Sequence, residues 1–167
     1  SEGMLKRGVD GIFCYDDLGS ATSLLFSPAM YREFIKPHHK KLAELCHSYG
    51  KVLHMHSHGH IKDMMDEIID AGIDILNPVG PSDNNDLSMF KEKWGNKITL
   101  LGGISTNISA MTNEQIEKHI IDVMTKGVPG GKFMPRTESG IPMMSPEKAK
   151  FFINTLAKYR HEFGAVK

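Results

Sequence analysis

GIDILN, residues 72–77, places a glycine directly before a short run of apolar and β-branched residues, and GVDGIF, residues 8–13, repeats the arrangement. A glycine after an apolar-periodic helix suits the left-handed cap that ends the helix, and the run that follows has the composition of a strand. This junction occurs five times, and the strands are expected at residues 9–15, 51–56, 73–77, 97–101 and 132–134. The repetition predicts helices that alternate with strands.

This alternation predicts an α/β fold with a parallel sheet, because parallel strands need crossover helices. Two architectures fit it: a five-stranded doubly wound sheet, or five consecutive βα units of a (β/α)8 TIM barrel. A complete barrel needs about 250 residues, whereas the chain has 167 and opens within what reads as a helix already under way. The barrel therefore implies a missing N-terminal portion. No linker rich in Ser, Gly or Pro divides residues 1–167, so we expect a single domain.

The charge balance excludes several classes of partner. Twenty basic and twenty acidic side chains cancel, and no basic stripe stands out, which argues against nucleic acid and anionic membranes. No apolar run approaches the roughly 20 residues that span a bilayer, and no signal-peptide pattern is recognisable. The two cysteines, Cys14 and Cys46, lie in different expected elements and suggest no disulfide framework. These features predict a cytoplasmic protein that acts on a small molecule.

The carboxyl ends of the expected strands are polar, and ligands of parallel sheets and barrels bind beyond these ends. The candidates for substrate binding there are Asn77, Gly103, Ser105 and Arg136. Asp16, Asp17 and Glu138 are the candidate catalytic residues, because a carboxylate at a strand end can serve as general acid or base. Neighbouring residues on a strand point in opposite directions, so at most one of the two aspartates is expected to face the site. A turn that leads through Gly19 is the alternative reading of this pair.

Four histidines alternate in VLHMHSHGHI, residues 52–61. Residues i and i+2 of a strand point the same way, about 6.5–7 Å apart. His54, His56 and His58 therefore share one face if the strand extends that far. Gly59 is expected to end the strand, which leaves His56 and His58 as the pair best suited to act together.

Two imidazoles at this spacing can converge on one zinc ion, although a catalytic zinc normally has three protein ligands. The third could come from the carboxylates on neighbouring strand ends: Asp16, Asp17 and Glu138. The alternative is that the histidines hydrogen-bond polar groups in the cleft and bind no metal. A further pair, His38 and His39, lies among lysines on an expected helix, and we expect it on the solvated surface.

Four segments, taken in order, resemble the uroporphyrinogen decarboxylase superfamily. They are GVDGIFCYDDLGSATSLLFSPAMYREFIKPHHKKL (8–42), VLHMHSHGHI (52–61), AGIDILNPV (71–79) and ITLLGGI (98–104). The superfamily also includes zinc-dependent methyltransferases that pass methyl groups between corrinoids and thiols. The resemblance covers nearly the whole chain and implies a TIM barrel of which the chain supplies about five C-terminal βα units. Its open edges would then be completed by the missing N-terminal segment or by self-association.

The resemblance also bears on the histidines. The methyltransferases have a zinc motif of the form His-x-Cys-Gly at the end of this strand and a later cysteine as third ligand. Residues 56–59, HSHG, align with that motif. The resemblance thus implies His56 as a zinc ligand, His58 in place of the first cysteine, and Glu138 as the best-placed third ligand.

The reaction that this implies is metal-dependent methyl transfer involving a corrinoid protein. One alternative is a metal-free uroporphyrinogen decarboxylase of porphyrin biosynthesis, which would act on a tetrapyrrole. The substrate-binding arginines and the key aspartate of the decarboxylases lie near the N-terminus, outside this chain. Another alternative is a protein that binds a tetrapyrrole or corrinoid without catalysis.

Overall fold

A computed structural model describes residues 1–140 and 143–164. Five parallel strands form one sheet in the order β1-β2-β3-β4-β5. Their bounds are β1 Gly11–Tyr15, β2 Val52–His56, β3 Ile75–Val79, β4 Thr99–Ile104 and β5 Phe133–Thr137. The spatial order follows the chain order, as in consecutive units of a barrel, whereas a doubly wound sheet reverses at a switch point. The (β/α)8-type arrangement is therefore confirmed, and the doubly wound alternative is wrong.

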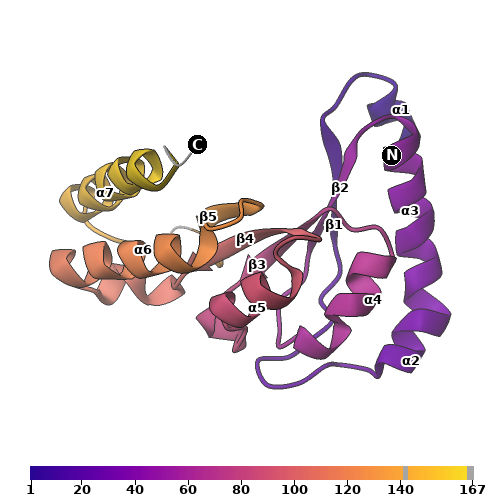
Figure 1. Cartoon of the computed structure of the whole chain (residues 1–167), viewed down its shortest axis with the longest axis horizontal. Coiled ribbons are helices and arrows are strands. Elements are labelled where there is room, and N and C mark those ends of the chain that lie inside the picture. Colours follow the sequence, from indigo (N-terminus) through magenta and orange to yellow (C-terminus); the bar gives the residue numbers. More distant parts are fainter. Residues whose placement is uncertain (141–142, 165–167) are drawn as a thin grey trace.

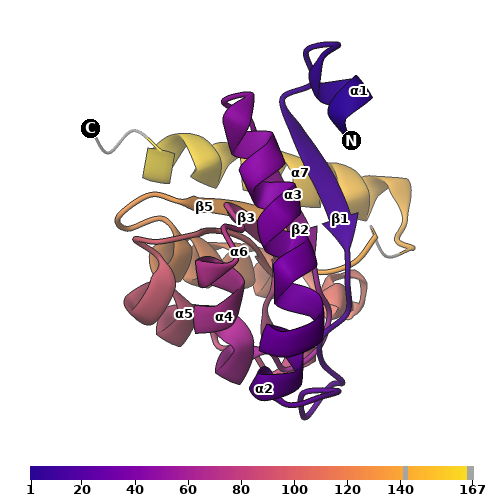
Figure 2. The ribbon, with the colours of Figure 1, turned by 90° about the vertical axis from the view of Figure 1, so that its right-hand side faces the viewer.

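The helices follow one another along the outer side of the curved sheet (Figure 1). They are α1 Glu2–Leu5, α2 Pro28–Met30, α3 Lys36–Ser48, α4 Met65–Asp70, α5 Leu87–Trp94, α6 Asn113–Gly127 and α7 Pro146–Gly164. Shorter turns are the π-helical η1 Tyr31–Ile35 and the 3-10 segments η2 Lys62–Met64, η3 Pro81–Asp83 and η4 Thr106–Ala110. Figure 2, turned by 90°, looks onto α3 as it runs in front of the sheet. Within the described residues, no helix is long and apolar enough to cross a membrane.

Polar side chains set where the longer helices begin. The carboxylate of Asp86 accepts a hydrogen bond from the Met89 N–H at 2.7 Å and so caps α5. Thr112 and Gln115 form a reciprocal capping box at the start of α6. Each such cap satisfies N–H groups that have no partner inside the helix. The caps fix the ends of the helices that flank the carboxyl edge of the sheet.

The two faces of the sheet differ in burial. Toward the helices, side chains such as Leu53, Met55, Leu76 and Leu100 are fully buried in one apolar core. We call the opposite side the inner face. The alternation of burial along β1, β2 and β5, with the register of β3 and β4, assigns to it Phe13, Tyr15, His54, His56, Asn77, Leu101, Met134 and Arg136. The Tyr15 side is open, since this residue is 73% exposed. The inner face therefore combines aromatic, imidazole and guanidinium groups within reach of a ligand.

Candidate active site at the carboxyl edge of the sheet

A carboxamide joins two histidines on the inner face. Asn77 of β3 lies between His54 and His56 of β2, with its Oδ1 2.7 Å from His54 Nε2 and its Nδ2 3.1 Å from His56 Nδ1. Burial is the main cause that lowers the pKa of both imidazoles, and the positive charge of Arg136 acts in the same direction. Asn77 itself is 1% exposed. The predicted substrate ligand Asn77 is thus occupied in holding the two imidazoles.

Aromatic rings of β1 border these imidazoles. The ring centroid of Phe13 lies 4.4 Å from that of His54, and the centroid of Tyr15 lies 5.1 Å from that of His56. Phe13 and Tyr15 also meet edge to face at 4.5 Å. Such rings offer apolar faces on which a planar ligand can stack.

His58 lies just past the end of β2 and forms a carboxylate–histidine pair with Asp83. The Nδ1–H of His58 donates to Asp83 Oδ2 at 2.8 Å, and the Asp83 side chain is only 11% exposed. The ring of His58 stands perpendicular to that of His56, with centroids 4.8 Å apart. The prediction that these two histidines lie together is thus supported by their geometry. Asp83 was not a sequence candidate, and only its place after β3 pointed toward the site.

Hydrogen bonds tie together the loops that follow β1, β2 and β3. The amide of Asn84 donates to the Ala21 carbonyl at 2.9 Å, and that of Asn85 donates to the Gly59 carbonyl at the same distance. The ring of His60 donates to the Asn84 carbonyl at 3.0 Å. The main chain that carries His58 is therefore held from both neighbouring loops.

The same loops cross backbone against backbone at Gly19 and Gly59. Gly59 has a φ of 101°, in the region that favours glycine, and a β-carbon there would overlap the main chain of Gly19. Only glycine fits both the conformation and the space.

The two aspartates after β1 point in different directions, as expected. Asp17 accepts a hydrogen bond from the His58 N–H at 2.8 Å and so holds the His58 main chain. Asp16 points toward the helices, where its Oδ2 lies 3.0 Å from Nε2 of His39, whose Nδ1 lies 2.8 Å from the Tyr31 hydroxyl. His39 is only 7% exposed, so the expectation that it lies on the surface is wrong; the strand-end carboxylate draws it into a buried chain of hydrogen bonds.

Glu138 lies apart from the histidines named with it for zinc. Its side chain is buried, and both carboxylate oxygens bind Ser82: Oε1 accepts from the main-chain N–H at 2.9 Å and Oε2 from the hydroxyl at 2.5 Å. Within residues 1–140 and 143–164, no group of three or more His, Cys, Asp or Glu side chains is arranged to hold a metal ion. The donor set His56, His58 and Glu138 does not fit a zinc centre in this arrangement. Zinc binding stays a prediction.

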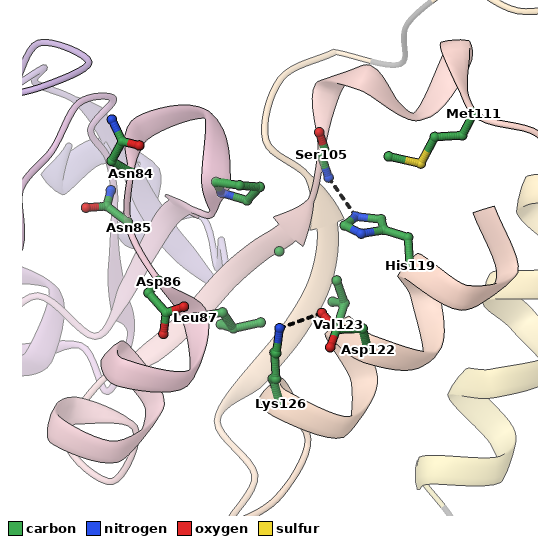
Figure 3. Close-up of a pocket in the computed structure, with 12 residues that line it drawn as sticks. Asn84, Asn85, Asp86, Leu87, Ser105, Met111, His119, Asp122, Val123 and Lys126 are labelled. Atoms are coloured by element: carbon green, nitrogen blue, oxygen red, sulfur yellow. Dashed lines mark hydrogen bonds and ion pairs between the residues drawn. The ribbon is translucent and has the colours of Figure 1, made fainter. Parts of the chain in front are cut away.

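Gly103 and Ser105 line a separate cavity of about 550 Å³ between the β3–α5 loop and α6 (Figure 3). A β-carbon at Gly103 would approach Val123 of α6 at 2.8 Å, so this position faces the helices and leaves the inner face. The Ser105 N–H donates to Nε2 of His119 at 3.0 Å. Arg136 is exposed on the inner face, which makes it the remaining predicted ligand positioned to meet a substrate there.

The partly buried histidines predict that stability falls as the solution becomes acidic. Burial is the first cause that lowers the pKa of these four below the ordinary value of 6.5: His39, His54, His56 and His119. The unfolded chain then binds protons at a higher pH than the folded chain, so stability is present above about pH 6.5 and is lost below it. Thermal denaturation between about pH 8 and about pH 5 should show a falling melting temperature. His119→Gln should flatten that slope, and replacement of the exposed His161 on α7 by glutamine should leave the slope unchanged. A melting temperature independent of pH would contradict the expectation.

Comparison with known proteins agrees with the (β/α)8-type fold. A family model described as uroporphyrinogen decarboxylase (URO-D) matches residues 1–159. No curated protein sequence matches the chain. Among solved structures, a methyltransferase from Methanosarcina mazei superposes with a TM-score of 0.69 at 22% sequence identity, over 95% of this chain and 44% of that protein. The chain thus has the fold of that methyltransferase and spans less than half of its length.

Proposed function

Since the chain belongs to the uroporphyrinogen decarboxylase family, we propose that it carries the acid–base group of an enzyme that decarboxylates a substrate rich in carboxylates, with a tetrapyrrole as the substrate class. The observation that carries this proposal is the His58–Asp83 pair at the carboxyl edge of the sheet. Because His58 Nδ1–H is held by a carboxylate, the tautomer of the ring is fixed and Nε2 is the nitrogen that exchanges protons.

Decarboxylation gives this pair a defined task. The carbon–carbon bond to the leaving carboxylate breaks, its electron pair stays on the substrate carbon, and carbon dioxide departs. That carbon then takes a proton from Nε2 of the His58 imidazolium, which returns to the neutral form. Asp83, held 2.8 Å from Nδ1, stabilises the imidazolium before the transfer. Solvent replaces the proton after each turnover.

The inner face supplies the binding surface in this proposal. Arg136 offers a guanidinium for a carboxylate, since its planar fork matches that group. Tyr15 and Phe13 offer ring faces to a planar substrate beside the imidazoles. These groups come from β1 and β5, the two edge strands of the sheet, so the substrate would extend from one edge of the curved sheet to the other.

The test is an assay of the full-length protein that contains this chain. We expect release of carbon dioxide from uroporphyrinogen under reducing, metal-free conditions. A protein that binds uroporphyrinogen and releases no carbon dioxide would instead match the non-catalytic binding alternative, and one that does neither would refute the proposal.

Metal-dependent methyl transfer involving a corrinoid protein is the second candidate. The specific observation in its favour is that the ring centroids of His56 and His58 lie 4.8 Å apart. Asp83 also hydrogen-bonds His58 in the way that carboxylates often hold metal-binding histidines. A solved structure that shares the fold is itself that of a methyltransferase. Zinc would act there as a Lewis acid toward the substrate.

Metal analysis separates the two candidates. After zinc loading and desalting, we expect the tag-free protein to retain less than about a tenth of an equivalent, because a catalytic zinc site needs three protein ligands. Retention of one equivalent that is lost in His56→Ala would overturn this expectation and favour methyl transfer. His161→Ala, an exposed histidine on α7, is the matched control.

A further inference from the structure

The carboxamide of Asn77 dictates which nitrogen of each neighbouring histidine carries a hydrogen. A carboxamide oxygen only accepts hydrogen bonds, and the NH2 group only donates them. His54 Nε2, 2.7 Å from Asn77 Oδ1, must therefore carry a hydrogen. His56 Nδ1, 3.1 Å from Asn77 Nδ2, must present a lone pair. A neutral His56 ring then carries its one hydrogen on Nε2.

This polarity determines what His56 can offer to a ligand. Its Nδ1 lone pair is used by Asn77, and its Nε2 is an N–H donor that makes no hydrogen bond to the described residues. A metal ion needs a lone pair, and neither nitrogen of His56 has one to give in this arrangement. An oxygen with negative charge, in contrast, would accept from Nε2–H. The Glu138 carboxylate does not play that part, because it is buried against Ser82 and, among the described residues, makes no hydrogen bond to His56.

A second donor lies on the same face. Arg136 of β5 is exposed, and the alternation of β5 places it on the inner face together with Met134. The carboxylates of Asp17 and Asp83 are both engaged by His58, the first by its main-chain N–H and the second by its ring. The inner face thus presents N–H donors from His56 and Arg136.

We propose that Asn77 is the specificity-determining residue of this face: it fixes His56 as a hydrogen-bond donor, so that His56 receives a carboxylate of the substrate and does not bind a metal ion. Arg136, three strands away on the same face, offers a donor to a second carboxylate. The substrate part of this inference rests on the proposed function, whereas the assignment of the His56 hydrogen does not. Because an amide supplies one donor and one acceptor, the His54 nitrogen that faces Asn77 donates and the His56 nitrogen that faces Asn77 accepts. An aspartate at position 77 would instead accept from both rings.

Nitrogen-15 NMR of the full-length protein labelled at histidine tests the assignment directly. We expect His54 and His56 both to carry their hydrogen on Nε2 at neutral pH. A hydrogen on Nδ1 of His56 would overturn the inference whether or not the enzyme has decarboxylase activity. If His56 has the expected tautomer but the enzyme releases no carbon dioxide, the proposed function fails and the role of Asn77 in setting the tautomer stands.

Asn77→Asp tests the consequence for metal binding. With two acceptor oxygens at position 77, His56 must donate its hydrogen from Nδ1. Its Nε2 then has a free lone pair, while the carboxylate accepts the hydrogen bond from Nδ1. Titrated with zinc ion alone, this variant should bind at least about tenfold more tightly than the wild type, in keeping with the effect of such partners. Asn107→Asp makes the same change of charge at an exposed site and should leave zinc affinity as it is. The gain should vanish in the double variant with His56→Ala, and equal affinity in the two aspartate variants would overturn the inference.

Benzoate serves as the carboxylate probe for the same variants. In the wild type it should shift the His56 Nε2 resonance, and Asn77→Asp should abolish that shift because the donor is gone. A wild-type resonance that does not respond to benzoate would contradict the carboxylate role.

Discussion

Replacement of His58 by glutamine should lower kcat of the full-length enzyme about a hundredfold or more, the usual contribution of a positioned acid–base group. The glutamine amide can still hydrogen-bond Asp83 but cannot carry a proton to carbon. The loss should appear in kcat, with substrate affinity changed little, since Arg136 and the aromatic rings remain. Steady-state kinetics of carbon dioxide release measures both quantities.

Two companion variants sharpen this result. Asp83→Asn removes the charge that stabilises the imidazolium and keeps an acceptor for Nδ1–H, so its loss should be smaller than that of His58→Gln. His161→Gln changes an exposed residue on α7 and should leave kcat unchanged. Activity of His58→Gln within a few-fold of the wild type would remove His58 from the reaction.

Gly59→Ala should destabilise the fold by about 2–4 kcal/mol, because it combines a strained backbone conformation with overlap against the main chain of Gly19. Backbone atoms on both sides leave no flexible side chain that could move aside. Urea denaturation gives the free energy of unfolding directly.

Gly8→Ala separates the two contributions. Gly8 has a similar φ of 87° but no atom within 4 Å of its would-be β-carbon. It should lose only about 1–2 kcal/mol, the cost of the left-handed conformation alone. Equal losses in the two variants would mean that the crossing of the loops contributes nothing to stability.

The alternation of helices and strands was predictable because each helix–glycine–strand junction is local in the sequence. The periodicity alone left open the choice between a barrel arc and a doubly wound sheet, since both use the same βα units and differ only in which strands pair. That pairing joins segments such as Ile75 and Thr99, 24 positions apart in the chain, and no local pattern encodes it. The resemblance of four segments to the superfamily predicted the barrel.

The candidate site likewise has a part that local sequence predicts and a part that it does not. The approach of His56 to His58 follows from the period of a strand, and the opposed directions of Asp16 and Asp17 follow from it too. The partnership of His58 with Asp83 spans 25 positions and depends on how two loops meet. Gly103 left the predicted site because Gly102 and Gly103 both have positive φ values, 145° and 84°, which break the alternation of the strand.

The loops after β1, β2 and β3 are linked to one another, and Ser82 extends these links to Glu138 after β5 and to Thr106 after β4. A substitution that reshapes one of these loops disturbs the other two through Asn84 and Asn85, so selection can change them only together. We expect relatives with new substrates to differ first on the inner face of the strands, where the side chain of Arg136 on β5 is exposed. Such a change on the strands would leave the linked loops, and with them the position of His58, as they are.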